Sequence, residues 1–532
     1  METGTSSTTP GVNRQIARAA GTVMFAFIIS NLVGVVRGMV ITDAFGTSAD
    51  LDSFNAANRI AELLFNLVAG GALGSAFIPV FTRFLVREDR QGAWRLASGV
   101  INLVLIVLVL ISVLVWIFAP QIVRDGLYFL VPDSNPVQIE LTVRLLRIML
   151  PSVIIFGLSG IVMGMLNAHQ VFLVPAIAPV MYSLGIIFGT LVLPKAWGIE
   201  RLAVGVVLGA LMHLLVQLPR LLRLPQRAYH LILGWKDKAV REVLKLMGPR
   251  VLGAAVVQLN FIANTVIALG QPEGSVSAIT LAFNLMLMPQ MAIAQSVAIA
   301  SLPTFSAQVV QGKLDEMCAS LASTLRVVLF LAIPASVGLI LLRVPLVQVL
   351  YQRGQFDAHS TQLVAWALLW YAAGLVGHSL VEILSRAFYA LHDTRTPVIV
   401  GVAAMGLNIT LSIFLSRVFV EIGWMPHGGL ALANSSATAL ESIVLLVLMN
   451  RRLQGLNGKH IWQGVGQAVL ASAVMAGALL GWGRLMAGYG VVWQLFGGLV
   501  LGVGVYALLA WLMKVPELRS ILAILKQKMA RK

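Results

Sequence analysis

Residues 96–119 read LASGVINLVLIVLVLISVLVWIFA, a run of 24 residues without a single charged side chain. An α-helix needs about 20 apolar residues to cross the hydrocarbon core of a bilayer, which is roughly 30 Å thick. The run lies between Arg95 and Pro120, and it is long enough to cross a membrane once. It therefore predicts a membrane-spanning helix.

Similar apolar runs recur along the whole chain. Of its 532 residues, 58% are hydrophobic and only 11% are charged, and the mean hydropathy is +0.88. This composition provides too little polar surface for a water-soluble protein of that size. We predict an all-α polytopic membrane protein with about fourteen transmembrane helices, at residues 17–42, 52–82, 96–119, 141–166, 172–193, 202–219, 243–270, 277–302, 321–343, 361–391, 397–416, 428–450, 462–487 and 491–513.

The cations fall in alternate loops. Lys and Arg residues near the ends of spans stay on the cytoplasmic side of a membrane. With the N-terminus inside, the outer loops are poor in cations, and the inner segments hold the Arg and Lys residues of 14–18, 83–95, 220–245, 451–459 and 514–532. We therefore predict that both termini are cytoplasmic, as an even number of spans requires. The net charge of +16 is explained by this bias and by contact with anionic lipid rather than by binding of nucleic acid.

The chain also repeats itself at a nearly constant offset. The matching residues are Pro79 and Pro303, Leu96 and Leu321, Pro120 and Pro345, and His169 and His392, at offsets of 223 to 225. Four matches in order, each at the same place relative to its span, indicate duplication of a six-span unit. Because six is even, both copies keep the same orientation. We predict two six-helix lobes related as parallel repeats, residues 1–225 and 226–455, followed by two additional C-terminal helices in residues 456–532.

The loops carry no signature of catalysis or of metal binding. No Gly-Lys pair is followed by Ser or Thr as in a phosphate-binding loop, and neither HExxH nor CxxC occurs. We therefore predict a transporter rather than an enzyme, without a cofactor or a metal, and leave coupling to the membrane potential or to an ion gradient open. Glycine pairs at a spacing of four residues, namely Gly70 with Gly74, Gly205 with Gly209 and Gly498 with Gly502, predict close packing of helices.

Polar side chains inside the spans are the candidates for a substrate path, because such groups are costly in hydrocarbon. They are Asn31, Arg37, Arg59, Glu62, Asn66, Gln258, Asn260, Asn264, Asn284, Gln290, His378, Glu382 and Arg386. Arg59 could instead neutralise Glu62 three residues on, and Glu382 could neutralise Arg386 four residues on. Arg37 could reach the membrane interface, and the asparagines could join helices by hydrogen bonds. The clustering on spans one, two, seven and eight, which open the two repeats, favours a polar cavity between the lobes.

Several stretches resemble one known family. They are SNLVGVVR at residues 30–37, GGALGSAFIP at 70–79, LNA at 166–168 with PAIAP at 175–179, MGP at 247–249, GSVS at 274–277 and YALHDTRTP at 389–397. In this order, and over nearly the whole chain, they resemble the MurJ/MviN family of the MOP superfamily of exporters.

The resemblance implies a flippase for lipid II, the undecaprenyl-pyrophosphate-linked peptidoglycan precursor. Such a flippase moves lipid II from the inner to the outer leaflet of the bacterial cytoplasmic membrane for cell-wall synthesis. The implied fold has two six-helix lobes around a cationic cavity, with a groove for the lipid tail at the last two helices and alternating access. The expected partners are lipid II or a similar polyprenyl-pyrophosphate-linked glycan, membrane lipids and cell-wall synthesis proteins, but no nucleic acid.

The resemblance also points to particular residues. Arg37 and Arg59 fall where the family has basic residues, and Asp52 falls on its acidic position, whereas Asn31, Gly70 and Asn284 replace residues that are usually charged. The expected substrate-binding residues are Arg37, Arg59, Asn31, Asn66, Asn284, Asp52 and Asn260. The replaced charges leave two alternatives open: export of another lipid-linked oligosaccharide or small molecule, and a scaffold that binds lipid without transporting it.

Overall fold

The structure is a computed structural model that describes residues 10–68, 71–131, 135–225, 228–456 and 458–518. Within these ranges every regular element is a helix. The chain divides into two compact units, Met1–Val266 and Ile267–Lys532. The prediction of an all-α protein is confirmed.

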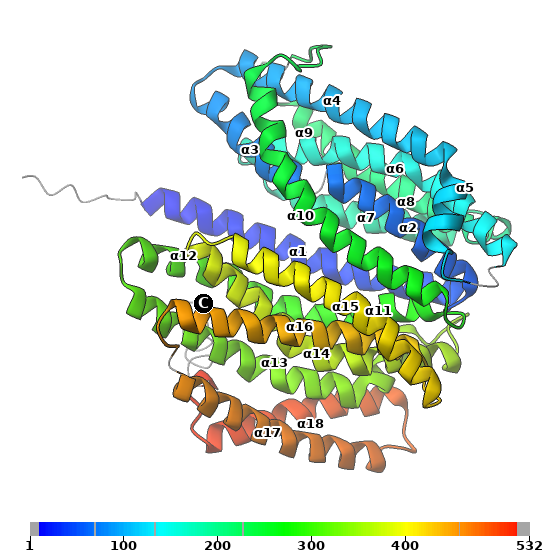
Figure 1. Ribbon diagram of the computed structural model, residues 1–532, viewed down its shortest axis with the longest axis vertical. Coiled ribbons are helices and arrows are strands. Elements are labelled where there is room, and N and C mark those ends of the chain that lie inside the picture. Colours follow the sequence, from blue (N-terminus) through cyan, green and yellow to red (C-terminus); the bar gives the residue numbers. More distant parts are fainter. Residues whose placement is uncertain (1–9, 69–70, 132–134, 226–227, 457, 519–532) are drawn as a thin grey trace, which may run out of the picture. The chain divides into compact units, whose positions relative to one another are not determined.

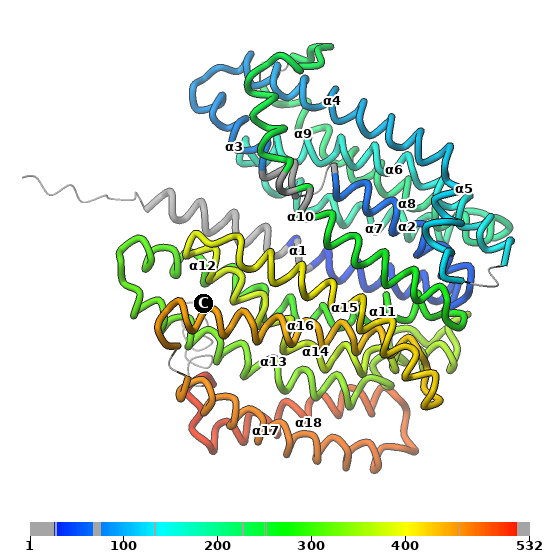
Figure 2. The backbone as a smooth tube through the Cα atoms, viewed as in Figure 1, coloured from blue at the N-terminus to red at the C-terminus, as the bar shows by residue number. Residues whose placement is uncertain are grey.

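The first unit is built mainly from long helices. Figure 2 shows α2, α6, α7 and α8 running alongside one another in this unit. Its helices are α1 (Pro10–Phe45), α2 (Ala49–Val68), α3 (Gly71–Val86), α4 (Arg90–Ile117), α5 (Ala119–Gln121), the π-helix η1 (Ile122–Leu127), α6 (Pro136–Ala168), α7 (Leu173–Val192), the 3-10 helix η2 (Lys195–Trp197), α8 (Glu200–Leu215) and α9 (Leu218–Leu222), and α10 (Lys238–Leu269) continues into the second unit.

The second unit repeats this pattern and ends with a helix pair. Figure 1 shows α17 and α18 side by side, and both pack against α13. The helices are α11 (Ser275–Gln290), the π-helix η3 (Met291–Gln295), α12 (Ser296–Val310), α13 (Leu314–Tyr351), α14 (Ala358–Ala390), α15 (Arg395–Glu421), α16 (His427–Arg452), α17 (Gly458–Leu485) and α18 (Val491–Leu512).

The count of membrane spans agrees with the sequence. In the described part of the chain, eleven helical segments are long and apolar enough to cross a membrane, and α10 makes a twelfth when its two halves count as one span. α2 is not among them, because it carries Asp50, Asp52, Arg59 and Glu62 within 20 residues. α1 and the pair α2 and α3 are the remaining long helical segments, so the helices are roughly consistent with the predicted fourteen spans. The chain is a polytopic membrane protein.

The two units contain matching helices with matching ends. α6 and α14 are both 33 residues long and begin 222 residues apart, at 136 and 358. The side chains of Asn135 and Asp357 cap their first turns by accepting a backbone N–H. After each helix one residue has a positive φ, Gln170 at 60° and His392 at 58°. The structure therefore matches His392 with Gln170, and not with His169 as the sequence suggested.

The C-terminal helix pair is attached to α13 by an apolar core and by hydrogen bonds, one of which depends on a proline. Leu342 and Met475 are among the buried residues that join α13 to α17 and α18. Pro334 has no N–H, so the carbonyl of Phe330 one turn earlier lacks its helical partner. The Tyr506 hydroxyl donates to that carbonyl at 2.6 Å. The proline in α13 thus creates the acceptor that fixes α18.

Glycine brings α7 and α8 into close contact. A Cβ added at Gly185, Gly189, Gly205 or Gly209 would meet the backbone of the neighbouring helix. Small residues at such a crossing let two helix backbones approach within van der Waals distance in a membrane. The predicted packing role of Gly205 and Gly209 is confirmed, whereas Gly70 lies outside the described residues.

Candidate substrate-binding site

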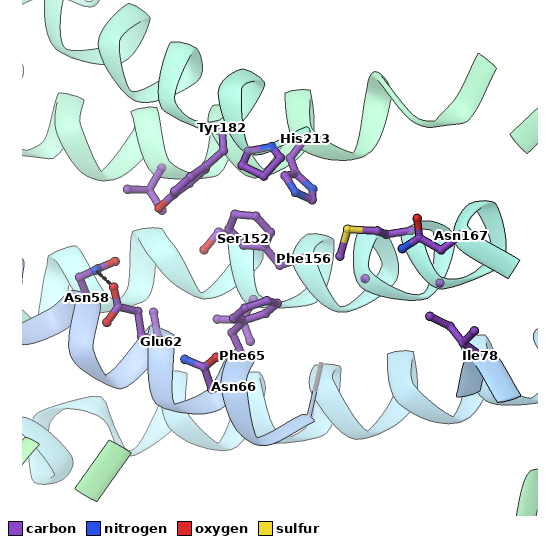
Figure 3. A pocket seen from close by; sticks show the side chains of 17 residues that line it. Asn58, Glu62, Phe65, Asn66, Ile78, Ser152, Phe156, Asn167, Tyr182 and His213 are labelled. Atoms are coloured by element: carbon purple, nitrogen blue, oxygen red, sulfur yellow. Dashed lines mark hydrogen bonds between the residues drawn. The ribbon is translucent and has the colours of Figure 1, made fainter. Parts of the chain in front are cut away.

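A cavity of about 490 Å³ lies within the first unit, among α2, α6, α7 and α8. Figure 3 shows polar and aromatic side chains pointing toward it from different helices. The labelled residues around it are Asn58, Glu62, Phe65, Asn66, Ile78, Ser152, Phe156, Asn167, Tyr182 and His213. The cavity therefore offers carboxamide groups and one carboxylate within an otherwise apolar and aromatic lining.

The polar face of α2 follows from its sequence spacing. Asn58, Glu62 and Asn66 are four residues apart in turn, so they lie one above the other on the same side of the helix. All three line the cavity, and the Asn58 amide donates to Glu62 Oε1 at 2.8 Å. Asn66, predicted from the sequence as a substrate-binding residue, is thus placed at a cavity wall.

Arg59 lies beside this polar face. Its guanidinium donates to Glu62 Oε2 at 2.8 Å, and its side chain keeps 20% of its exposure. The same guanidinium lies 5.1 Å from the ring centroid of Phe261 on α10. The predicted pairing of Arg59 with Glu62 is confirmed, so the carboxylate that lines the cavity is charge-compensated by the arginine.

Arg37 reaches the same region from α1. Its guanidinium lies 5.7 Å from the ring centroid of Tyr182, a cavity residue on α7. Cation–π contact of this kind holds a guanidinium in place without removing its hydrogen-bonding capacity. Arg37, Arg59 and Glu62 together carry a formal charge of +1 around the cavity.

A hydrogen-bonded group of buried side chains supports the far wall. His213 Nδ1 and Ser159 Oγ are 2.7 Å apart, and the Gln217 amide donates to the same Oγ at 2.8 Å. Phe156 contacts both the Tyr182 ring and the His213 ring edge-on, with centroids 5.0 and 5.4 Å apart. The sequence analysis missed Tyr182 and His213, because each is a single residue in an apolar run with no spacing signal.

The remaining expected residues lie elsewhere. Asn31 is exposed on α1, and Asp52 is buried in the first turn of α2 without lining the cavity. Asn260 on α10 accepts a hydrogen bond from the Asn264 amide at 2.7 Å. Asn284 is exposed on α11 in the second unit. Of the expected residues, only Asn66 lines the cavity. Arg37 and Arg59 lie behind the lining and contact its residues Tyr182 and Glu62.

The second unit has polar groups of its own at membrane depth. Glu382 and Arg386 on α14 form the predicted ion pair. His378 Nε2 lies 3.0 Å from Asn434 Oδ1 on α16. Glu441 on α16, which the sequence analysis did not single out, lies beside Gly401 of α15.

The first-unit cavity suits recognition of an anionic group more than chemistry on it. Two arginines contact its lining residues Tyr182 and Glu62 and can each donate charge-assisted hydrogen bonds, and its wall has asparagines that donate or accept. In the described part of the chain, no group of three or more His, Cys, Asp or Glu residues could hold a metal ion.

Comparison with known proteins identifies the family. A family model described as lipid II flippase MurJ matches residues 41–501. A lipid II flippase MurJ from Burkholderia cenocepacia is 32% identical over 443 residues, which cover 82% of this chain and 84% of the relative. A probable lipid II flippase MurJ from Vibrio cholerae is 30% identical, with 88% and 89% covered.

Solved structures show the same fold. A lipid II flippase MurJ in an inward closed conformation matches with a TM-score of 0.77 at 24% identity and covers 92% of this chain and 98% of its own. An inward-facing multidrug resistance MATE transporter of the MOP superfamily matches with a TM-score of 0.67 at 15% identity, with 82% and 99% covered. The chain belongs to the lipid II flippase MurJ family, a family of membrane transporters and not of enzymes.

Proposed function

We propose that this protein flips lipid II from the inner to the outer leaflet of the bacterial cytoplasmic membrane. The observation that carries the proposal is the placement of Arg37 and Arg59 beside the polar cavity of the first unit, in a chain of the MurJ family. A pyrophosphate loses its hydration when it crosses hydrocarbon, so it needs fixed cations and hydrogen-bond donors along its route.

In this mechanism the two arginines hold the pyrophosphate while the polyprenyl chain stays in lipid. Arg59 is paired with Glu62, so an arriving phosphate exchanges with that carboxylate rather than meeting a bare charge. Alternating access then exposes the headgroup to the other side of the membrane. The π-helix η3 follows Pro289 and interrupts the α11–α12 rod, which provides a place for that rod to bend.

The proposed orientation has both termini and residues 236–238 in the cytoplasm, and the loop at Glu273 outside. On a background in which Cys318 is replaced by Ser, a membrane-impermeant thiol reagent should label Glu273→Cys and spare Lys238→Cys in intact cells. The reverse labelling pattern would overturn the orientation. Coupling to the membrane potential or to an ion gradient is proposed as the energy source.

Rescue of a strain depleted of its own lipid II flippase tests the function. The parent protein should restore growth and cell shape, and purified protein in vesicles should move fluorescent lipid II between leaflets. Flipping of another polyprenyl-linked glycan but not of lipid II would favour a different cargo. Binding of lipid II without any movement would favour a scaffold, and either result would refute the proposal.

A further inference from the structure

A second cavity, of about 620 Å³, lies in the second unit, away from the site described above. It is formed by α13, by the first turns of α17 and by the segment that follows α18. Its lining combines a charged side chain, two carboxamides and apolar groups.

A buried ion pair forms one side of this cavity. Arg326 Nε lies 2.6 Å from Glu517 Oε1, and the two side chains are only 4% and 7% exposed. The Arg326 guanidinium also donates to the backbone carbonyl of His460 at 3.1 Å. α17 can pass directly over the guanidinium because residue 464 is glycine, where an added Cβ would lie 2.8 Å from Arg326 Nε. The arginine is therefore held rigidly at the cavity wall.

One face of α17 turns polar side chains toward the same cavity. His460, Gln463 and Gln467 are spaced three and four residues apart, so they lie on one side of the helix, and all three line the cavity. The side-chain carboxamides of Gln463 and Gln467 have no hydrogen-bond partner among the residues that the structure describes. The His460 ring instead lies against the Arg326 guanidinium, with Nδ1 2.9 Å from Arg326 Nη1. Each carboxamide can donate two hydrogen bonds and accept two. The wall thus offers unused donors next to an arginine.

The charge and the position of the cavity favour an anionic ligand from the membrane. Lys459 and Lys514 are exposed and adjoin the lining residues His460 and Met513 along the chain. Both lysines belong to segments that the charge bias places in the cytoplasm, where the membrane leaflet is rich in anionic lipid. Trp462 is 73% exposed on the same turn of α17, as is common for tryptophan at the level of lipid headgroups.

Apolar groups continue from the polar end of the cavity. Leu470 lies one turn beyond Gln467 on the same face of α17, and Met513 adds a second apolar wall. A free phosphate ion would gain nothing from these side chains, whereas the glycerol and first acyl carbons of a lipid would lie against them.

We propose that this cavity binds the phosphate headgroup of an anionic phospholipid from the cytoplasmic leaflet. Gln463 and Gln467 donate to the phosphate oxygens, Lys459 and Lys514 supply the positive field, and Leu470 and Met513 contact the start of the acyl chains. The bound lipid would occupy the seam between α13 and the C-terminal helix pair. This inference does not depend on the proposed flipping of lipid II.

Native mass spectrometry and thermal unfolding of the purified full-length protein test the proposal. Phosphatidylglycerol should be retained on the parent protein in preference to phosphatidylcholine and should raise its melting temperature more. The double variant Gln463→Leu, Gln467→Leu keeps the helix and a similar side-chain size and should bind phosphatidylglycerol at least about a hundredfold more weakly, because two hydrogen bonds to a charged phosphate are lost. Gln362→Leu, an exposed glutamine on α14 outside the cavity, is the matched control and should bind as the parent does.

Three results would overturn the proposal. The first is equal retention of phosphatidylglycerol and phosphatidylcholine by the parent, a measurement that requires no variant. The second is an unchanged preference in the double variant at equal melting temperature in detergent alone. The third is a stabilisation by inorganic phosphate as large as that by phosphatidylglycerol at the same concentration, which would assign the cavity to a free anion.

Discussion

Two arginine–glutamate pairs of this protein have the same chemistry and opposite surroundings. Arg59 and Glu62 lie three residues apart on α2, keep 20% and 41% of their side-chain exposure, and adjoin a cavity. Arg326 and Glu517 are 191 residues apart in the chain and only 4% and 7% exposed. The first pair can therefore open to a ligand, whereas the second links two parts of the fold.

The difference follows from which contacts can replace each pair when it breaks. A half-exposed pair can be replaced by contacts with water or with a phosphate, so breaking it costs little. A buried pair leaves an uncompensated charge in a low-dielectric region, and the remaining partner bears most of the penalty. Substitutions in the two pairs should therefore separate loss of transport from loss of structure.

The largest effect is expected at the buried pair. Arg326→Ala should destabilise the protein by about 3–5 kcal/mol, because Glu517 would remain buried without its cation. The apparent melting temperature and the amount of protein in the membrane should both fall, as measured by thermal unfolding in detergent and by immunoblotting.

A double replacement sharpens this test. Arg326→Met with Glu517→Leu removes both charges and keeps similar side-chain volumes, so it should regain most of the lost stability. If Arg326→Ala were as stable as the parent, the pair would not be what joins α13 to the C-terminal segment.

A smaller but more specific effect is expected at the cavity. Arg37→Ala and Arg59→Ala should each lower lipid II flipping roughly ten- to a hundredfold, since one charge-assisted hydrogen bond is worth about 1.5–3 kcal/mol. Abundance and melting temperature should change little. Lysine at either position should retain part of the activity, because a point charge still attracts phosphate although the bidentate geometry is lost.

Arg144→Ala is the matched control for the cavity arginines. Arg144 is exposed in the same unit and pairs with Glu140 and Glu200, away from the cavity. Its replacement should leave flipping unchanged. Should Arg37→Ala and Arg59→Ala also flip lipid II at the parental rate and equal abundance, the cationic-cavity mechanism would be wrong.

The fold could be predicted because its main determinants are local. An apolar run long enough for a bilayer predicts one membrane span, and eleven or twelve helical segments of the described chain meet that criterion. Ion pairs within one helix could also be predicted, since the three-residue spacing of Arg59 and Glu62 places the two side chains next to each other. Close helix packing at Gly205 and Gly209 was predicted from their spacing of four residues in the same way.

Contacts between distant segments could not be predicted in this way. Nothing in the sequence links Arg326 to Glu517, and no spacing brings Tyr182 of α7 to Arg37 of α1. His213 meets Ser159 only because α6 and α8 pack together. Offsets between repeats were correct to within a few residues, but only backbone geometry showed that Gln170 matches His392.

The smallest effect on lipid II flipping is expected at Asn31 and Asn284. Asn31 and Asn284 are exposed on helices of the predicted polar path, within predicted membrane spans. If they face a water-filled route, Asn31→Arg and Asn284→Arg should leave the amount of protein in the membrane nearly unchanged, whereas an arginine facing lipid costs about 2.5–3.5 kcal/mol. Each substitution adds a cation at an expected substrate-binding position, so a moderate increase in lipid II flipping is expected. Flipping rates in vesicles, normalised to protein content, provide the measurement. A decrease in flipping at normal abundance would show that this chain has adapted its polar path to asparagine. Asn31 and Asn284 would then act with Arg37 and Arg59 in transport, as neutral groups that the path requires.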